Sequence, residues 1–334
     1  IVSLTFLYFW FKTFSDEEFK KSLFYLVFGG FIAAIYGIYQ SLEPTYIHTY
    51  PTYVSTFGNV NFAGNYMAII LPFIFLFSLP FKLNEYKAFI FRFFCFISIF
   101  LYLVRTETRS SWLAFLTSFF VILFFVVKSG KLKIFSEYTK NVWNKSKIKF
   151  SFFTISIVII LSLFCNFELA KLQSRVVETI KMEGSVSVRF MIWKSSFEMI
   201  KSNPLGVGAG NFAQNFYKYR NPKEYSISER RTVEHPHNTW ILIMSESGIF
   251  GTLLFGAIVF STLFSLIKSI KKNEMSLYFL ASFISWITIS LFSLPLVSPS
   301  SGLFLPFISA FANKESEKFV FKIRDKIIFT KLIP

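Results

Sequence analysis

The stretch His235-Pro236-His237-Asn238-Thr239-Trp240 lies where a polar loop meets a long apolar run, residues 239–267. The run exceeds the roughly 20 residues that an α-helix needs to cross the hydrocarbon core of a bilayer. Pro236 stops the preceding segment, and Asn238 is a residue type that caps helix N-termini, so a membrane helix is predicted to begin beside His237. Two of the chain's three histidines therefore lie at a predicted boundary between water and lipid.

The composition of the whole chain indicates a membrane protein. Hydrophobic residues make up 53% of the 334 positions and 48 residues are Phe, which lies outside the range of soluble globular domains. We predict an all-α polytopic membrane protein with about nine transmembrane helices. Because the sequence begins at Ile1 with neither Met nor a charged leader, we expect further helices upstream. The predicted membrane segments besides 239–267 lie near 22–41, 62–80, 88–104, 110–127, 150–166, 275–293 and 302–312, and residues 1–11 read as the end of one more.

The basic residues alternate between the predicted loops. Segments 12–21, 81–92, 128–149, 268–274 and the tail from Lys314 hold 22 of the 35 Lys and Arg. The opposite connections are nearly bare: 42–61 and 294–301 have no Lys or Arg, and 105–109 has Arg105 and Arg109. By the positive-inside rule the Lys-rich side faces the cytoplasm. The net charge of +16 is therefore interpreted as a topology signal and an attraction to anionic lipid, and nucleic acid is not an expected partner.

The same reasoning divides the chain into four parts. Residues 1–166 are expected to form transmembrane helices with short loops, 167–236 a large outer loop, 237–313 further transmembrane helices, and 314–334 a basic cytoplasmic tail. Within the large loop, residues 189–200 have apolar residues at helical spacing (Phe190, Trp193, Phe197 and Ile200) and predict an amphipathic helix. The glycine-rich stretch 203–212 that follows is a predicted turn. It lacks both Gly-Lys-Ser/Thr and the GxGxxG spacing of nucleotide loops.

Two outer connections carry candidate ligand-binding residues. Arg105 and Arg109 lie in a short turn between two membrane helices and are interpreted either as anchors at the bilayer surface or as a phosphate clamp, for which the bidentate guanidinium is suited. Asn59 and Asn61 end the loop 42–61 and are either turn residues or, with His48, groups that bind a polar ligand.

Glu246 lies nominally inside the membrane segment that follows His237, where an unpaired carboxylate is costly. Nine residues at about 100° each separate it from His237, which puts the two on opposite faces of a continuous helix. We therefore favour a structural role for Glu246 over a catalytic one. Gly248 and Gly251 fall on the His237 side, where small residues would let a neighbouring helix approach closely.

The outer face offers few groups for metal-dependent or nucleophilic chemistry. The two aspartates, Asp16 and Asp325, lie on the Lys-rich side, and no DxD or HExxH arrangement occurs, so no metal or cofactor is expected and no Ser-His-Asp triad can form. What remains is His237, with His235 as a weaker alternative, together with outer arginines. Histidine titrates in the range that suits a general base near neutral pH, although an interfacial histidine can also be only a structural residue.

At this point the motifs resemble those of the O-antigen ligase family, which includes lipopolysaccharide O-antigen ligases, polysaccharide polymerases and protein O-oligosaccharyltransferases. His237-Asn238, nine residues, and then Gly248-Ile249-Phe250-Gly251 resemble its signature His-[Asn/Ser/Gln]-x9-Gly-x-x-[Gly/Thr/Trp]. The N-terminus departs from the family, which usually has additional spans there. Other stretches similar to family segments are 187–193, 203–212, 108–112 and 57–61.

The resemblance implies a type C glycosyltransferase-like fold in the bacterial inner membrane, with a periplasmic active site. It implies metal-independent, inverting transfer of a glycan from an undecaprenyl diphosphate carrier to an acceptor hydroxyl. His237 matches the family's catalytic histidine, and Arg109 and Arg189 match the arginines that would hold the leaving diphosphate. Possible substrate contacts are Asn59, Asn61, His235, Asn238, Arg105 and Arg220, with Arg175, Arg230 and Arg231 as weaker candidates.

Three alternatives for the activity stay open. The acceptor can be lipid A core, a growing polysaccharide or a protein, so the chain can be a ligase, a polymerase or a protein O-oligosaccharyltransferase. From another class, a transporter could bind the same lipid-linked sugar without cutting it. A transporter would be expected to have internal repeats and an ionisable pathway, and the sequence shows no repeat and one clear intramembrane acid, Glu246.

Overall fold

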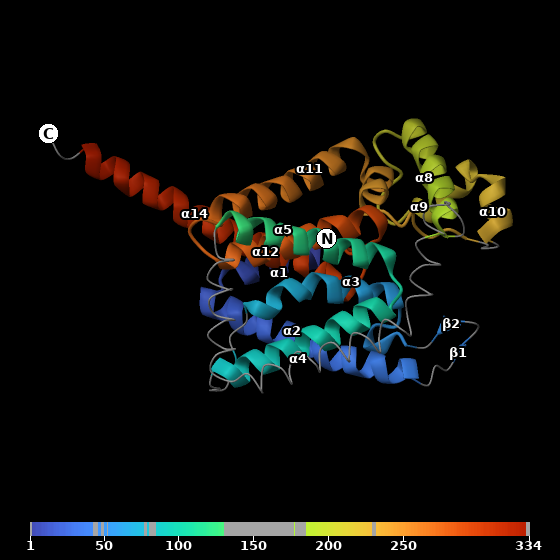
Figure 1. The fold of residues 1–334 in the computed structure, drawn as a ribbon. Coiled ribbons are helices and arrows are strands. Elements are labelled where there is room, and N and C mark those ends of the chain that lie inside the picture. Colours follow the sequence, from blue (N-terminus) through green and yellow to red (C-terminus); the bar gives the residue numbers. More distant parts are fainter. Residues whose placement is uncertain are drawn as a thin grey trace. The chain divides into compact units, whose positions relative to one another are not determined.

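The structure is a computed structural model that describes residues 2–42, 46–47, 50–51, 53–76, 79, 85–129, 177, 185–228 and 232–331. The chain divides into two compact units, one of residues 1–118 and 188–334 and one of residues 119–187. The described part of the smaller unit holds the end of one long helix and the start of another. The larger unit contains most of the described helices (Figure 1).

The described residues are helical apart from turns and two strands of two residues each. These strands, β1 (Tyr46–Ile47) and β2 (Tyr50–Pro51), pair antiparallel. The helices, in chain order, are α1 (Val2–Lys12), α2 (Asp16–Leu42), the 3₁₀ helix η1 (Ser55–Phe57), α3 (Val60–Ile70), η2 (Leu71–Phe75), α4 (Glu85–Arg105), α5 (Arg109–Lys128), α8 (Ser185–Ser202), α9 (Phe212–Phe216), η3 (Tyr217–Tyr219), α10 (Pro222–Ser228), α11 (Thr239–Ser269), α12 (Met275–Phe292), α13 (Pro299–Gly302) and α14 (Phe304–Lys331).

Five helices among the described residues are long and apolar enough to cross a membrane. They lie in α2, α4, α5, α11 and α12, and they confirm the predicted segments 22–41, 88–104, 110–127, 239–267 and 275–293. The chain is therefore an all-α polytopic membrane protein. The predicted segment 1–11 corresponds to α1 (Val2–Lys12), and the predicted segment 302–312 lies in α13 and α14, of which α14 continues to Lys331. The predicted segment 150–166 lies outside the described residues.

The predicted segment 62–80 differs from the structure. Its α-helix, α3, ends at Ile70, and the chain continues as the 3₁₀ helix η2 with Pro72 at its start. Proline has no N–H to donate and its ring clashes with the preceding turn, which explains the change of helix type at this point.

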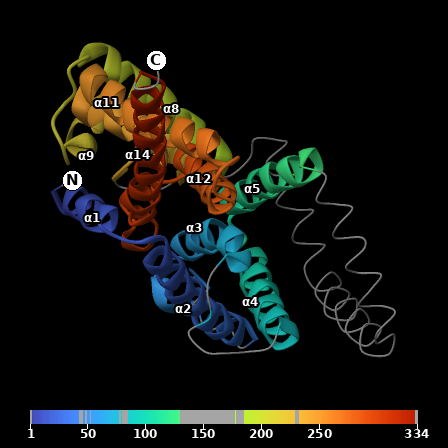
Figure 2. The same ribbon diagram turned by 90° about the vertical axis from the view of Figure 1, so that its left-hand side faces the viewer.

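Helix α12 is the most buried of the five and packs against α3, α11 and α14 (Figure 2). Its small polar side chains hydrogen-bond to main-chain carbonyls of other helices. Ser282 Oγ donates to Ile69 O (2.8 Å), and Ser285 Oγ donates to Ala114 O (2.8 Å) and Ala68 O (3.2 Å). Small residues permit this close approach of backbones in a medium where apolar side chains gain little by meeting each other. These bonds fix α12 relative to α3 and α5.

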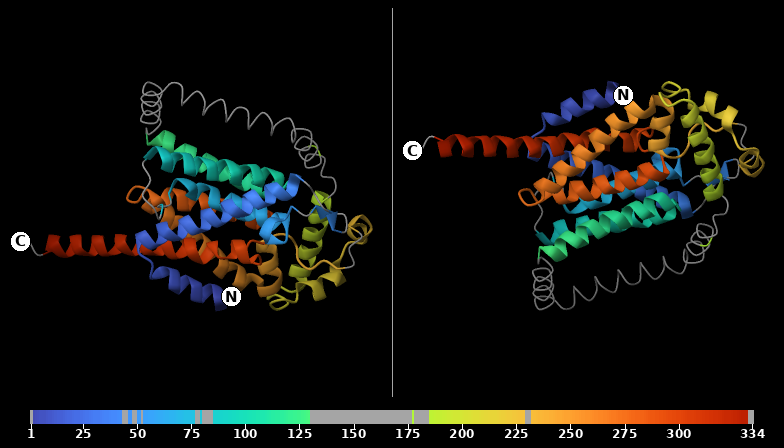
Figure 3. Two further views of the ribbon diagram at one scale, coloured as in Figure 1. Left: turned by 90° about the horizontal axis from the view of Figure 1, so that it is seen from below. Right: turned by 90° about the horizontal axis from the view of Figure 1, so that it is seen from above.

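The loops predicted to share one face lie at one end of the helices. The turn before α5 contacts the start of α3, and the loop before α11 contacts the end of α12. We call this the histidine end. The Lys-rich turn between α11 and α12 lies at the other end (Figure 3). There, Lys12 pairs with Glu317 (2.6 Å) and Lys314 with Asp16 (3.4 Å), which joins α14 to α1 and α2.

Helix α11 is broken at Gly248, whose backbone lies in the left-handed region (φ 64°, ψ −163°). The break frees the carbonyls of Ser245 and Glu246, which an intact helix would bond to residues 249 and 250. The glycine-rich stretch 203–212 supplies the replacement donors: Val207 N–H binds Ser245 O and Gly208 N–H binds Glu246 O, both at 2.9 Å. In return, Ile249 N–H donates to Pro204 O at 3.0 Å.

This arrangement corrects the prediction that Gly248 and Gly251 admit a neighbouring helix. A Cβ on Gly248 would overlap the main chain of Leu205, and a Cβ on Gly206 would overlap that of Glu246. Gly248 and Gly206 therefore allow the glycine-rich loop, and not a neighbouring helix, to reach the backbone of α11. A Cβ on Gly251 would meet the side chain of Ser247 from the same helix.

We predict that Gly248→Ala destabilises the protein by about 2 kcal/mol or more, because it adds a left-handed strain and a main-chain overlap. The matched control is Gly29→Ala in α2, where an added Cβ meets nothing within 4 Å. It should leave the melting temperature in detergent unchanged or slightly raised, because Ala is the better helix former. A Gly248→Ala melting temperature equal to that of the unaltered protein would contradict the role assigned to the break.

Candidate functional site

The loop before α11 places His237 in a strained conformation between two anchored residues. Asn238 is the N-cap of α11, as predicted: its Oδ1 accepts hydrogen bonds from Trp240 N (2.9 Å) and Ile241 N (3.1 Å). Its Nδ2 donates to Leu291 O at 2.8 Å. His237, one residue earlier, has a left-handed backbone (φ 52°), which is uncommon for a residue with a Cβ. Its ring meets that of His235 edge to face, with centroids 4.7 Å apart.

The position of His237 corrects the helical-phase argument that set it opposite Glu246. His237 precedes the N-cap Asn238 and has a left-handed backbone, so a constant 100° per residue does not hold between His237 and the start of α11. Glu246 lies at the break, where its Oε1 accepts a hydrogen bond from Phe212 N, the first residue of α9 (3.3 Å). The carboxylate thus satisfies a donor at a helix N-terminus, where negative charge is favourable.

The C-terminus of α12 receives three polar side chains, one from α8 and two from the start of α11. The last carbonyls of a helix have no partner within it. Asn238 Nδ2 binds Leu291 O, Arg189 Nη1 binds Phe292 O (3.1 Å), and Thr239 Oγ1 binds Ser293 O (3.1 Å). The guanidinium also lies at the negative end of the helix dipole. The end of α12 therefore brings Arg189 and the His237 loop together.

Helix α8 carries Arg189 and holds the His237 loop from the other side. Trp193, one turn after Arg189, donates from its indole Nε1 to Pro236 O at 2.7 Å. The helix is fixed by a core of Ile192, Met199, Phe212, Phe216 and Val233.

The core shows which side chains of the helix predicted for residues 189–200 are buried within the fold. The helix itself is present, but Phe190 and Phe197 are 47% and 48% exposed, whereas Ser195 and Ser196 are buried beside Ile192 and Met199.

The turn that carries Arg105 and Arg109 packs on the start of α3. Thr108 Oγ1 lies 3.4 Å from both Asn61 Oδ1 and Val60 O, and Glu107 takes the left-handed conformation that the tight turn requires (φ 51°). Asn59 is the N-cap of α3, and its Oδ1 accepts a hydrogen bond from Asn61 N at 2.8 Å. Asn59 and Asn61 thus have a role in the turn that begins α3, as one of the two interpretations predicted, and Asn61 lies next to Thr108 of the arginine turn.

A buried polar chain connects the arginine turn to α12. Ser111 Oγ donates to Asn65 Oδ1 (2.9 Å), and Asn65 Nδ2 donates to Ser293 Oγ (3.2 Å). Asn65 and Ser111 are fully buried, so the bond between them is shielded from water. Arg109 begins α5 two residues before Ser111. Sequence reasoning missed Asn65, although an amide inside an apolar run was the signal that could have found it.

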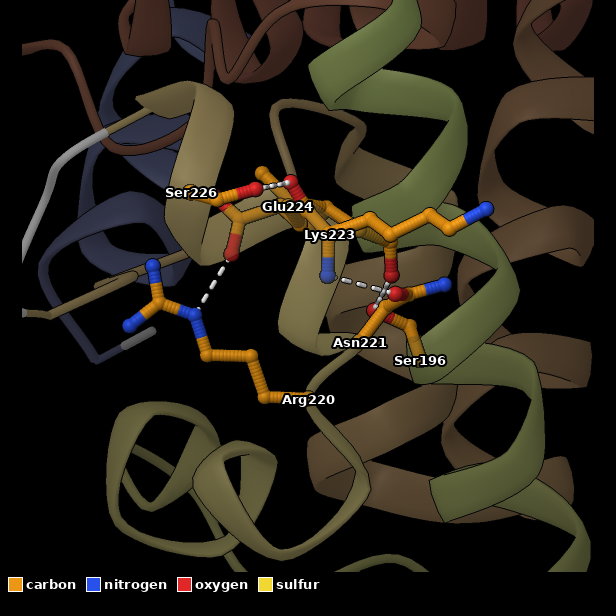
Figure 4. A network of polar contacts seen from close by, with 7 residues as sticks. Ser196, Arg220, Asn221, Lys223, Glu224 and Ser226 are labelled. Atoms are coloured by element: carbon orange, nitrogen blue, oxygen red, sulfur yellow. Dashed lines mark hydrogen bonds and ion pairs between the residues drawn. The ribbon is translucent and has the colours of Figure 1, made fainter.

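Arg220 lies apart from this network, in the segment between α9 and α10 (Figure 4). Its Nε pairs with Glu224 Oε2 at 2.5 Å, and the side chains are 12% and 1% exposed. Its guanidinium also lies over the Tyr225 ring, 5.0 Å from the centroid. The charge is therefore used within the fold. The other weaker candidates, His48, Arg175, Arg230 and Arg231, lie outside the described residues.

The chemistry available at the histidine end is that of imidazole and guanidinium groups. Across the described ranges, no three His, Cys, Asp or Glu side chains are grouped so that they could hold a metal ion. The site as described can accept a proton at His235 or His237 and place positive charge beside an anion through Arg105, Arg109 or Arg189.

Comparison with known proteins places these features in one family. Residues 93–256 match the family model described as O-Antigen ligase. The matched range includes the arginine turn, α8, the glycine-rich loop, the His237 loop and the break in α11. A comparison with curated proteins gave no match. The chain belongs to the O-antigen ligase family.

Proposed function

We propose that the protein transfers a glycan from a polyprenyl diphosphate carrier, undecaprenyl diphosphate in bacteria, to an acceptor hydroxyl. The family is one of membrane glycosyltransferases of the O-antigen ligase and polymerase type. The observation that carries the proposal is that the His237 loop and Arg189 bind the last residues of α12, to which the start of α5 is also linked through Asn65. These segments are distant in sequence. Together they bring a histidine, which can act as a base, and arginines, which are permanent cations, to one end of α12.

His237 is the proposed general base. It takes the proton of the acceptor hydroxyl, and the resulting oxygen attacks the anomeric carbon of the donor sugar. The bond from that carbon to the diphosphate oxygen breaks, and the electron pair leaves with the polyprenyl diphosphate. Attack from the side opposite the leaving group inverts the configuration. The left-handed backbone of His237 supports this role, because strained residues persist where the surrounding structure holds them, and such residues are concentrated at functional sites.

Arg109 and Arg189 are the proposed partners of the leaving diphosphate. Guanidinium stays charged at all relevant pH values and has five N–H donors in a planar fork, a geometry that matches the oxygens of a diphosphate. Charge that develops on the departing oxygen is stabilised best by donors already fixed in place. The mechanism needs no metal ion to supply that charge.

The proposed location is the bacterial inner membrane, with the histidine end in the periplasm. The argument is the excess of Lys and Arg in the loops at the other end. Lipid-linked glycan and an acceptor would meet there, and lipid A core, a growing polysaccharide or a protein are the acceptors to be compared.

Donor cleavage is the direct test of this function. We expect the purified protein in proteoliposomes to release free polyprenyl diphosphate from a synthetic polyprenyl-diphosphate-linked oligosaccharide when an acceptor is present. Supplying the donor alone, with lipid A core, or with an acceptor protein distinguishes polymerase, ligase and protein transferase by the product formed. Movement of intact donor across the bilayer without cleavage would instead identify a transporter.

We expect His237→Ala to lower donor turnover about 10²- to 10⁴-fold, the usual contribution of a general base. Its melting temperature should stay near that of the unaltered protein, because Asn238 and not His237 makes the cap bonds. His235→Ala, measured in the same assay, should cost less. A larger loss for His235→Ala would move the base role to His235, and near-normal turnover by a folded His237→Ala would remove His237 from it.

We expect Arg109→Ala and Arg189→Ala each to lower kcat/KM for the donor about 10²- to 10³-fold, in line with the loss of one preorganised donor. Arg→Lys at each site should recover part of this loss, because the charge is kept while the fork geometry is lost. The control is Lys201→Ala on α8, whose exposed pair with Glu198 lies on the surface and should not affect turnover. Unchanged kinetics in both arginine variants would contradict the diphosphate role.

A further inference from the structure

The peptide group directly before His237 is held by a residue from another helix. Trp193 of α8 donates its indole N–H to the carbonyl of Pro236 at 2.7 Å, and Pro236 is buried. That carbonyl belongs to the same planar peptide unit as the nitrogen of His237. Fixing the carbonyl direction therefore limits the rotation that sets the backbone angle φ of His237.

His237 needs such a constraint because its φ of 52° is unfavourable for a residue with a Cβ, by about 1–2 kcal/mol. Asn238 provides one anchor, through its bonds to Leu291 O and to the first turn of α11. Trp193 provides the second anchor, on the preceding residue. His237 therefore lies between two residues, Pro236 and Asn238, that are each held by hydrogen bonds.

Trp193 is itself well placed to act as a rigid anchor. Its ring packs against Phe190 (centroids 5.3 Å apart) and Phe292 (6.3 Å). Arg189, four residues earlier on the same helix, is bonded to Phe292 O. One turn of α8 therefore sets both the place of a proposed diphosphate ligand and the orientation of the proposed base.

We propose that Trp193 is a positioning residue that acts through His237. This inference rests on the proposed function of His237 as base. Its consequence is that the indole N–H contributes to turnover and contributes little to donor binding. A base misplaced by about 1 Å can cost on the order of 10²-fold in rate.

The first test is Trp193→Phe, which keeps a ring and removes the N–H. We expect kcat for donor turnover in proteoliposomes to fall about 10- to 100-fold, with little change in the KM of the donor. Trp286→Phe is the matched control, because it removes an indole N–H bond from α12 to Ser301 O of α13 (3.2 Å). It should lower the melting temperature and leave kcat unchanged. A Trp193→Phe variant with normal kcat would overturn the proposal.

A double variant separates positioning from a general structural effect. In a His237→Gln background, Trp193→Phe should lower the residual turnover no further, because the group through which it acts is already gone. An equal loss in both backgrounds would overturn the proposal. The rate at which diethyl pyrocarbonate modifies His237, measured by peptide mass spectrometry, gives a readout that does not depend on turnover. Trp193→Phe should raise this rate relative to Trp286→Phe, and an unchanged rate counts against positioning even if His237 proves not to be the base.

Discussion

The carbonyls at the C-terminus of α12, which have no partner within the helix, are the feature on which the site depends. A membrane helix must satisfy its terminal main-chain groups where water is scarce. Here Asn238, Arg189 and Thr239 satisfy them, and each belongs to a segment that the proposed chemistry requires. The buried serines of α12 in turn fix that helix against α3 and α5. The position of the site thus follows from the packing of the membrane helices.

A second constraint, the break in α11, connects the long loop to the membrane helices. The glycine-rich stretch has the appearance of a flexible turn, yet its N–H groups replace donors that the helix lost at Gly248. Without the glycine-rich stretch, the main-chain groups of α11 at the break would be unsatisfied, and the same holds for the stretch without α11. The loop therefore folds onto α11 through directional bonds, and the core beneath α8 adds apolar burial to this docking.

Sequence predicted the five long apolar helices, because a helix that crosses a bilayer needs a long apolar run whatever its partners are. It failed where a result depends on distant partners. The run 239–267 reads as one helix, since the break at Gly248 requires a loop some 40 residues earlier. Helical spacing predicted α8 but does not tell which of its residues are buried: Phe197 is exposed, and the small Ser195 and Ser196 are buried. His237 and Arg109 were identified by residue type and position, and Arg189 through the family resemblance, but their arrangement follows from contacts that residue types do not encode.

The anchors on α12 are main-chain oxygens, and every residue has one. A substitution at Leu291 or Phe292 changes a side chain and keeps the acceptor oxygen that Asn238 or Arg189 needs. This part of the site can therefore drift in sequence over evolution while its geometry persists. The family match ends at residue 256, before α12 begins at Met275. The end of α12, which holds the site together, thus lies outside the region by which the family is recognised. A comparison of side chains does not detect its contribution, because that contribution is made by main-chain oxygens.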